Sequence, residues 1–249
     1  MSRPVAIITG ASGGIGRACA LALASAPLPF DVALHYQSNA SSTNALAEQI
    51  FAGGRAHAAV FQADLTSSGA AEALVGEVVA KLGPPAALIH CAGRIIEKPI
   101  GFTRPEDFDS LLSLHAVSAA RLSREMLRYV RKMDCGRLVY IGSLAGEIGL
   151  GNAAAYAAAK GALGGLCKSL ALEAARWKTT VNVIAPGYVD TEMVATQDLE
   201  RREQLEASVP LNRFARAEEI AAVAAFLCSP GAAYITGQTI VVDGGMSLG

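Results

Sequence analysis

Short apolar runs alternate with longer amphipathic segments along the chain. The short runs are rich in β-branched residues and indicate strands, whereas the longer segments repeat their apolar residues at helical spacing. The pattern predicts strands at Val5–Thr9, Asp31–Tyr36, His57–Gln62, Ala86–His90, Gly136–Gly142, Thr180–Ala185 and Thr239–Val242. Between them it predicts helices near residues 14–25, 40–52, 67–82, 106–132, 153–176 and 217–228.

This alternation predicts an α/β fold: a Rossmann-like, doubly wound parallel sheet of about seven strands with helices on both faces. Neither an internal repeat nor a linker divides the sequence, so we expect residues 1–249 to form a single domain. Ligands of such sheets bind beyond the carboxyl ends of the strands. Candidate functional residues are therefore expected at those ends.

Composition narrows the class of protein. Hydrophobic residues make up 52% of the chain, charged residues 17%, and the formal net charge is -1. The near-neutral balance argues against nucleic acid as a partner, and no apolar run is long enough to span a bilayer. Five cysteines are scattered without a C-x-x-C pair. We expect a soluble cytoplasmic protein that buries part of its surface against other subunits.

The first predicted strand leads directly into a glycine-rich loop. Thr9-Gly10-Ala11-Ser12-Gly13-Gly14-Ile15-Gly16 follows the run Val5–Ile8 and precedes an apolar-periodic segment. In a strand–turn–helix, glycines let backbone N–H groups approach a pyrophosphate at the positive end of the helix dipole. The alternative is a tight turn without a ligand, which this loop alone does not exclude.

Tyr156 and Lys160 stand four residues apart in an alanine-rich predicted helix, and Ser143 follows the fifth predicted strand. Residues at i and i+4 share a helix face, so the phenol and the ammonium would meet in one space. A nearby cation favours phenolate, and a shift of three pKa units corresponds to roughly 4 kcal/mol. A serine that holds a carbonyl oxygen while the tyrosine protonates it would perform carbonyl reduction. The alternative is a half-buried aromatic residue beside a solvated cation.

Together these motifs resemble the short-chain dehydrogenase/reductase family over nearly the whole chain. The matching positions are Thr9-Gly10 with Gly14 and Gly16, Asp64-Leu65, Ala92-Gly93, Ser143, Tyr156 with Lys160, Pro186-Gly187 with Thr191, Tyr234–Gly237 and Val242–Gly245. Within the family the segments around Ser143, Tyr156, Asn182 and the C-terminus are most similar to β-ketoacyl-acyl-carrier-protein reductases. Related enzymes that act on other ketones and alcohols share many of these sequence motifs.

The resemblance implies roles for individual residues. Ser143 would orient the carbonyl oxygen, Tyr156 would donate the proton, and Lys160 would lower the phenol pKa and bind the nicotinamide ribose. Asp64 would contact the adenine and Thr191 the carboxamide, although both are also suited to cap a helix. The implied cofactor contacts are Thr9, Gly10, Ser12, Gly14, Ile15, Gly16, Tyr36, Ser38, Asp64, Leu65, Ala92, Gly93, Tyr156, Lys160, Pro186, Gly187, Val189 and Thr191.

The end of the second predicted strand bears on the choice of cofactor. It reads Tyr36-Gln37-Ser38, without the carboxylate that commonly binds the ribose 2′-hydroxyl of NAD. An uncharged pocket leaves room for a 2′-phosphate, so we expect NADP(H) in preference to NAD(H). No His, Cys or carboxylate cluster at ligand spacing indicates a metal.

Two positions depart from the family pattern. His90 and His115 stand where relatives carry asparagines, and the second of those asparagines normally supports a water that relays protons to the lysine. We interpret His115 as a structural or relay substitute in the catalytic group. Two hypotheses follow: a competent NADPH-dependent reductase, or a cofactor-binding subunit of a hetero-oligomer that is slow alone.

The resemblance also implies a lid and partners. Residues 190–213 are polar and follow Pro186-Gly187, which places them where the family has a mobile lid over the substrate; the alternative is a solvated helix. A homotetramer is expected, and a 3-oxoacyl thioester on an acyl-carrier protein or CoA is the expected substrate. Another small ketone or alcohol remains the alternative.

Overall fold

The computed structural model describes residues 3–133, 135–191 and 199–248. One parallel sheet of seven strands runs through it in the order β3-β2-β1-β4-β5-β6-β9, which confirms the predicted fold class. Its strands are β1 (Val5–Thr9), β2 (Asp31–Tyr36), β3 (Ala58–Gln62), β4 (Pro85–His90), β5 (Arg137–Ile141), β6 (Thr180–Pro186) and β9 (Thr239–Val242). Strands β1 to β3 are added toward one edge of the sheet and β4 to β9 toward the other, so the switch point of the doubly wound sheet lies between β1 and β4.

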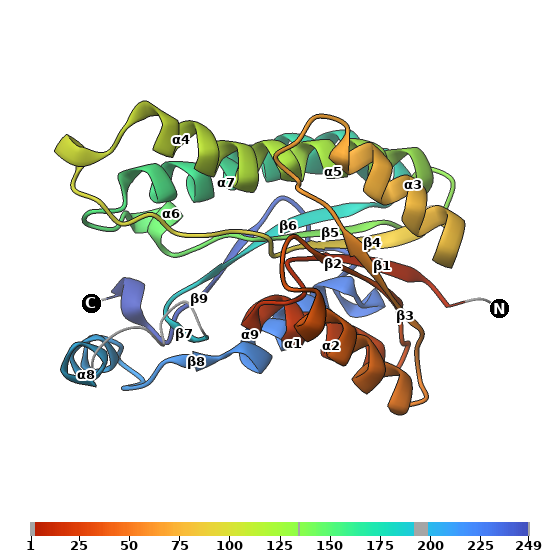
Figure 1. Ribbon diagram of the computed structural model, residues 1–249, viewed down its shortest axis with the longest axis horizontal. Coiled ribbons are helices and arrows are strands. Elements are labelled where there is room, and N and C mark those ends of the chain that lie inside the picture. Colours follow the sequence, from red (N-terminus) through yellow and green to blue (C-terminus); the bar gives the residue numbers. More distant parts are fainter. Residues whose placement is uncertain (1–2, 134, 192–198, 249) are drawn as a thin grey trace.

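Helices cover both faces of the sheet (Figure 1). One face carries α1 (Gly14–Ser25), α2 (Ala40–Ala52) and α9 (Ala217–Cys228); the other carries α3 (Ala70–Leu82), α5 (Ser118–Val130) and α7 (Ala154–Ala174). Successive strand residues point to opposite faces, so Ile8 joins the core under α1 and Ile7 joins the core under α5. Both strand faces are apolar because both are buried.

The helix predicted near residues 106–132 is present, but it is not α-helical throughout. The segment divides into α4 (Pro105–Leu112), a π turn η2 (Ser113–Val117) and α5. The Ser118 amide donates to the Ser113 carbonyl five residues back. One extra residue in a turn rotates every later side chain about the helix axis, so spacing rules do not carry across residue 113.

The region after β6 is built from short elements. β7 (Val189–Asp190) pairs in parallel with β8 (Ala215–Arg216), and α8 (Leu199–Ala207) lies beside them (Figure 1). Arg202 links this helix to Asp190 at 3.1 Å. Residues 192–198 of the predicted lid lie outside the described residues. The remaining short helices are α6 (Ala145–Ile148), η1 (Ile100–Phe102), η3 (Ala175–Trp177), η4 (Pro230–Ala232) and η5 (Met246–Leu248).

A membrane-crossing helix would have to be both long and apolar, and none within the described ranges meets that requirement.

Candidate active site

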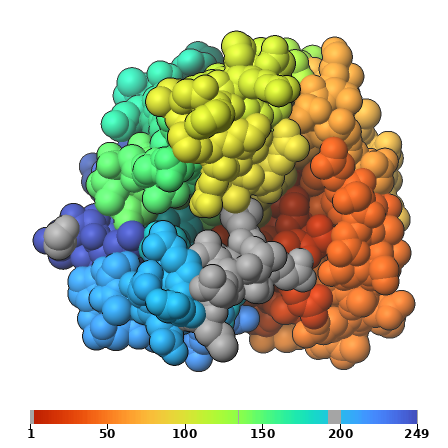
Figure 2. All heavy atoms as spheres, turned by 60° about the vertical axis from the view of Figure 1, so that its left-hand side comes forward, coloured from red at the N-terminus to blue at the C-terminus, as the bar shows by residue number. Residues whose placement is uncertain are grey.

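A cavity of about 670 Å³ lies at the carboxyl ends of the central strands, beside the switch point between β1 and β4. The glycine loop forms one wall, and the residues that follow β4, β5 and β6 form the others. Figure 2 shows a hollow in which red atoms of the N-terminal elements lie beneath the yellow segment around η1 and α4. The motifs expected at strand ends therefore meet in one space.

Backbone packing fixes the glycine loop. A Cβ on Gly16 would lie 2.2 Å from the carbonyl oxygen of Gly10, which is too close for any side chain. Gly10 itself has φ +65 and packs against the backbone of Ala92. The loop between β1 and α1 is thus wound tightly and presents main-chain groups to the cavity at a helix N-terminus, an arrangement suited to a pyrophosphate.

The predicted cofactor residues divide into two groups. Those that line the cavity are Gly10, Ser12, Gly14, Ile15, Gly16, Gly93, Tyr156, Lys160, Pro186, Gly187, Val189 and Thr191. The described cavity wall does not include Thr9, Tyr36, Ser38, Asp64, Leu65 or Ala92. Their roles toward a cofactor stay predictions.

Asp64 and Leu65 illustrate the second group. The carboxylate of Asp64 accepts hydrogen bonds from the amide and hydroxyl of Thr66 at 3.0 and 2.7 Å, which lower its pKa. Leu65 is buried in the core under α3. The contacts of Asp64 stabilise a turn and not a helix cap, because α3 begins at Ala70 with Gly69 as its N-cap.

The catalytic triplet comes together across two elements. Tyr156 and Lys160 lie on one face of α7, as their spacing predicts, and Ser143 follows β5. Gly146 on α6 packs so closely on α7 that a Cβ there would lie 2.7 Å from the Gly161 amide nitrogen. The Ser143 hydroxyl lies near enough to the Tyr156 phenol to lower its pKa.

Burial sets the protonation of this group. It raises the pKa of Tyr156, and the neighbouring Ser143 hydroxyl lowers it by less. The net direction is upward because desolvation of the phenolate is the largest effect, and the expected effect of Lys160 on this pKa stays a prediction. The Lys160 ammonium donates to the Ile141 carbonyl at 2.7 Å, and burial lowers its pKa to about 8. Tyr156 therefore holds its proton at neutral pH, as an acid must.

His115 lies in the π turn against the same tyrosine. The two rings meet edge to face with centroids 5.7 Å apart, and His115 lines the cavity. Its Nε2 lies 2.9 Å from the Arg94 carbonyl oxygen, which favours the tautomer protonated there. Burial and the charge of Lys160 lower its pKa to about 2, so the ring is neutral in the working pH range.

Sequence reasoning missed most of the outer wall. The additional lining residues are Gly13, Cys91, Arg94, Ile95, Glu97, Ile141, Gly142, Leu144, Ala145, Ile148, Gly149, Leu150, Tyr188 and Met246. Most of them directly follow β4, β5 or β6, so the rule that places ligands at strand ends could have found them. Burial is the largest cause of the raised pKa values of Tyr156 and Tyr188. The negative charge of Glu97 raises both pKa values further.

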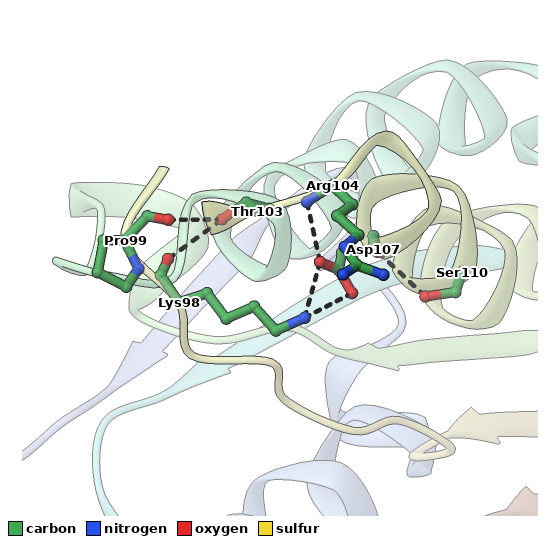
Figure 3. A network of polar contacts seen from close by, with 6 residues as sticks. All are labelled: Lys98, Pro99, Thr103, Arg104, Asp107 and Ser110. Atoms are coloured by element: carbon green, nitrogen blue, oxygen red, sulfur yellow. Dashed lines mark hydrogen bonds and ion pairs between the residues drawn. The ribbon is translucent and has the colours of Figure 1, made fainter. Parts of the chain in front are cut away.

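The segment that carries these outer residues is held by polar contacts (Figure 3). Lys98 donates to both carboxylate oxygens of Asp107 at 3.1 and 2.9 Å, and the Arg104 amide donates to the same carboxylate at 3.0 Å. The Thr103 hydroxyl donates to the Lys98 carbonyl at 3.2 Å. These bonds fix the stretch between β4 and α4 at the cavity rim.

A bound metal ion would need several ligating side chains close together. Within the described ranges, no three His, Cys, Asp or Glu side chains gather in a way that could hold a metal ion.

Comparison with known proteins agrees with this geometry. A family model described as enoyl-(acyl carrier protein) reductase matches residues 10–247. The 3-oxoacyl-(acyl-carrier-protein) reductases FabG of Pseudomonas aeruginosa and Escherichia coli are 36% and 35% identical to this chain, covering 98% of it and 97% of each relative. The crystal structure of acetoin dehydrogenase from Enterobacter cloacae superposes with a TM-score of 0.90 at 32% identity, covering 100% of this chain and 96% of that one.

Proposed function

Because this chain belongs to the short-chain dehydrogenase/reductase family of oxidoreductases, we propose that it is an NADPH-dependent reductase of 3-oxoacyl thioesters. The observation that carries the proposal is the buried phenol of Tyr156, which is protonated at neutral pH and lines the cavity together with Ser143. Reduction of a carbonyl requires an acid at that point. The names of the FabG relatives support an acyl thioester on a carrier protein or CoA.

A nicotinamide dinucleotide fits the residues present. The main chain of Gly10–Gly16 would hold the pyrophosphate, and Pro186, Gly187 and Thr191 would border the nicotinamide. When bound in its reduced form, the nicotinamide would supply the hydride. Lys160, anchored on the Ile141 carbonyl at 2.7 Å, would hold a positive charge beside the ribose.

The chain's own residues then complete the reduction. Ser143 orients the carbonyl oxygen, and Tyr156 gives its proton to that oxygen as the carbon accepts the hydride, which leaves a hydroxyl group and a phenolate. Burial, which raises the phenol pKa, keeps the proton on Tyr156 until the carbonyl oxygen takes it, and it disfavours the phenolate that is left. Lys160 stabilises the phenolate that forms, because its ammonium lies 5.8 Å from the centre of the phenol ring.

The NADPH preference rests on the absent carboxylate. Within the described residues, the end of β2 presents Tyr36, Gln37 and Ser38, and Gln37 and Ser38 are exposed. No negative charge in this stretch would repel a 2′-phosphate.

The apolar outer wall supports an acyl substrate. Ile95, Ile148, Leu150 and Met246 line the cavity beyond Tyr156 and offer an acyl chain apolar contact.

A small ketone or vicinal diol is the second candidate substrate, favoured by the acetoin dehydrogenase structure. A slow, cofactor-binding subunit of a hetero-oligomer is the other alternative, and His90 and His115 motivate it. We propose a cytoplasmic homotetramer. Exposed apolar side chains on α7, α9 and the edge strand β9 support self-association: Leu172, Phe226 and Val241.

Steady-state consumption of NADPH and NADH by the purified chain tests the proposal. The panel contains a 3-oxoacyl thioester, its N-acetylcysteamine analogue, acetoin and a cyclic ketone. We expect the highest kcat/KM with NADPH and a thioester. Higher kcat/KM with acetoin would favour the second candidate, and equal kcat/KM with the two cofactors would refute the NADPH preference.

A further inference from the structure

A second buried histidine lies directly behind the active site. His90 is the last residue of β4, is 1% exposed, and stands opposite Thr9 at the end of β1 in the sheet register. Neither residue lines the cavity among the described residues. Thr9 begins the glycine loop, and the other edge of the His90 ring faces the π turn that carries His115.

Hydrogen-bond capacity fixes the direction of the first contact. The Thr9 hydroxyl oxygen accepts from the amides of Cys91 and Ala92, both at 3.1 Å. These two bonds occupy its lone pairs, so the hydroxyl has only its proton left to give. His90 Nδ1 lies 2.9 Å away and accepts that proton. Nδ1 therefore carries no hydrogen, and in a neutral ring the proton sits on Nε2.

The second contact continues in the same direction. His90 Nε2 lies 3.2 Å from the Ser118 hydroxyl oxygen, which accepts from it. Ser118 in turn donates to the Leu114 carbonyl, four residues back and inside the π turn. A serine that bonds to this carbonyl bends a helix and competes with regular helical bonding. The ring also feels the carbonyls of Leu114 and His115, which partly offset the effect of burial on its pKa.

We propose that His90 is a positioning residue. Its neutral imidazole, protonated on Nε2, accepts a hydrogen bond from Thr9, at the start of the glycine loop, and donates one to Ser118, which donates to the Leu114 carbonyl. This chain of hydrogen bonds fixes the position of the π turn beside Tyr156 and Lys160. The effect on turnover rests on the proposed reductase function, whereas the network and its effect on the turn do not.

The electrostatic effect of Lys160 on both histidines shows that the π turn lies close to the catalytic group. The Lys160 ammonium acts on both His90 and His115, lowering the pKa of each. A displaced turn would therefore change the surroundings of Lys160 and of the Tyr156 ring, which touches His115. The cofactor loop and the proton donor are thus linked through the buried His90 ring, and His115 is the residue of this link that lines the cavity.

The tautomer gives the first test. The chain has four histidines, so a protein labelled with ¹⁵N-histidine gives few imidazole signals, and the His90 signals are those that vanish in His90→Asn. We expect the Nε2–H tautomer from pH 5 to pH 8. An Nδ1–H tautomer, or protonation of His90 within that range, would overturn the proposal.

Ser118→Ala gives the second test, with Ser123→Ala as the matched control. Ser123 is a buried serine of the same helix that bonds to the Tyr140 phenol at 2.6 Å. Ser118→Ala loses the hydrogen bonds to His90 and Leu114, and Ser123→Ala loses the bond to Tyr140, but only Ser118→Ala is expected to shift the His115 imidazole signals. It should also lower kcat about tenfold while the dissociation constant for NADPH stays within about threefold. Unshifted His115 signals in a folded Ser118→Ala protein would refute positioning by this network.

Two further variants separate the ends of the network. His90→Asn keeps an acceptor for Thr9 near the place of Nδ1 but cannot reach Ser118, whereas His90→Gln keeps a donor near the place of Nε2. We expect His90→Asn to shift the His115 signals and His90→Gln to leave them closer to wild type. The reverse order would contradict the proposed direction. Because these signals need no substrate, an inactive wild-type protein would count against the reductase function and not against the network.

Discussion

The helix that carries Tyr156 and the helical segment that packs against its ring differ in regularity. α7 runs unbroken from Ala154 to Ala174, and its i, i+4 pair Tyr156 and Lys160 meets at the cavity as expected. The sequence predicts a helix over most of the neighbouring segment from Pro105 to Val130, yet a π turn interrupts its α-helical spacing at Ser113–Val117. Helical spacing therefore predicts that Tyr156 and Lys160 meet, but it does not predict how His115 packs against the Tyr156 ring.

Local and distant contacts account for this difference. α7 is rich in alanine, a strong helix former, and its regularity needs little from elsewhere. In our proposal the π turn depends on hydrogen bonds among Ser118, His90 and Thr9, which come from three separate elements. A feature that is stabilised by contacts distant in the sequence leaves no periodic signal in its own segment.

Tyr156→Phe removes the proton donor from the regular helix and should have the largest effect. We expect the turnover number to fall at least about a hundredfold, because general acid catalysis is lost while the ring still packs on His115. The dissociation constant for NADPH should stay nearly constant. Single-turnover rates together with equilibrium binding check both, and a variant that kept most of its turnover would show that another group supplies the proton.

Gly93→Ala should disturb the π turn, because the new methyl group would clash with His115. A Cβ at this position would lie 2.3 Å from His115 Cε1, and the ring is held by Arg94. We expect the free energy of unfolding to fall by about 3 kcal/mol, the upper range for overpacking.

Combining Gly93→Ala with His115→Ala should restore much of this loss, because the side chain that clashes is gone. Thermal and urea unfolding of the singles and the double measure the coupling. Simple additivity of the two losses would mean that the clash is relieved by another movement.

Acid pH should destabilise the protein through His90, which is buried next to the segment that contains the π turn. The pKa of His90 is about 3 in the folded protein, against 6.5 for an ordinary histidine. The unfolded chain binds more protons between these values, so stability falls as the pH drops. Between pH 7 and pH 5 this histidine should account for about 2 kcal/mol of lost stability.

His90→Asn should reduce that pH dependence by the same amount, even though the variant starts less stable at pH 7. Urea unfolding at both pH values measures it. An unchanged difference between pH 7 and pH 5 would show that His90 is not buried as a neutral ring.

His115→Asn should have the smallest effect. The imidazole is neutral across the working range, because its pKa is about 2, and its Nδ1 has no hydrogen-bond partner within the described structure. We expect the turnover number to stay within about twofold and the pH profile to be unchanged, since the turn is held by other residues. A variant at least ten times faster would make His115 a handicap and support the slow-subunit alternative.

The fold was largely predictable because it rests on repeated local patterns. Strand positions, the sheet class and the glycine loop all follow from residues near one another, and only strand ends moved by a residue or so. The chemical triplet was predictable for the same reason.

Three features were not predictable, each for a physical reason. The pKa of Tyr156 is raised by burial, which depends on packing that no short motif encodes. The outer wall with Glu97 depends on how the stretch after β4 folds back over the cavity. The role of His90 depends on the register between β1 and β4.

The pH dependence of reduction and of the reverse oxidation by the wild-type enzyme tests the central claim most directly. If protonated Tyr156 is the acid, reduction should be constant from pH 6 to near pH 8 and should then fall, as Lys160, whose pKa is about 8, loses its charge. Oxidation, which needs the phenolate, should rise with pH over the lower part of this range. A reduction rate that climbs with pH would contradict the account, because the proton donor would then have to be a group other than the buried phenol.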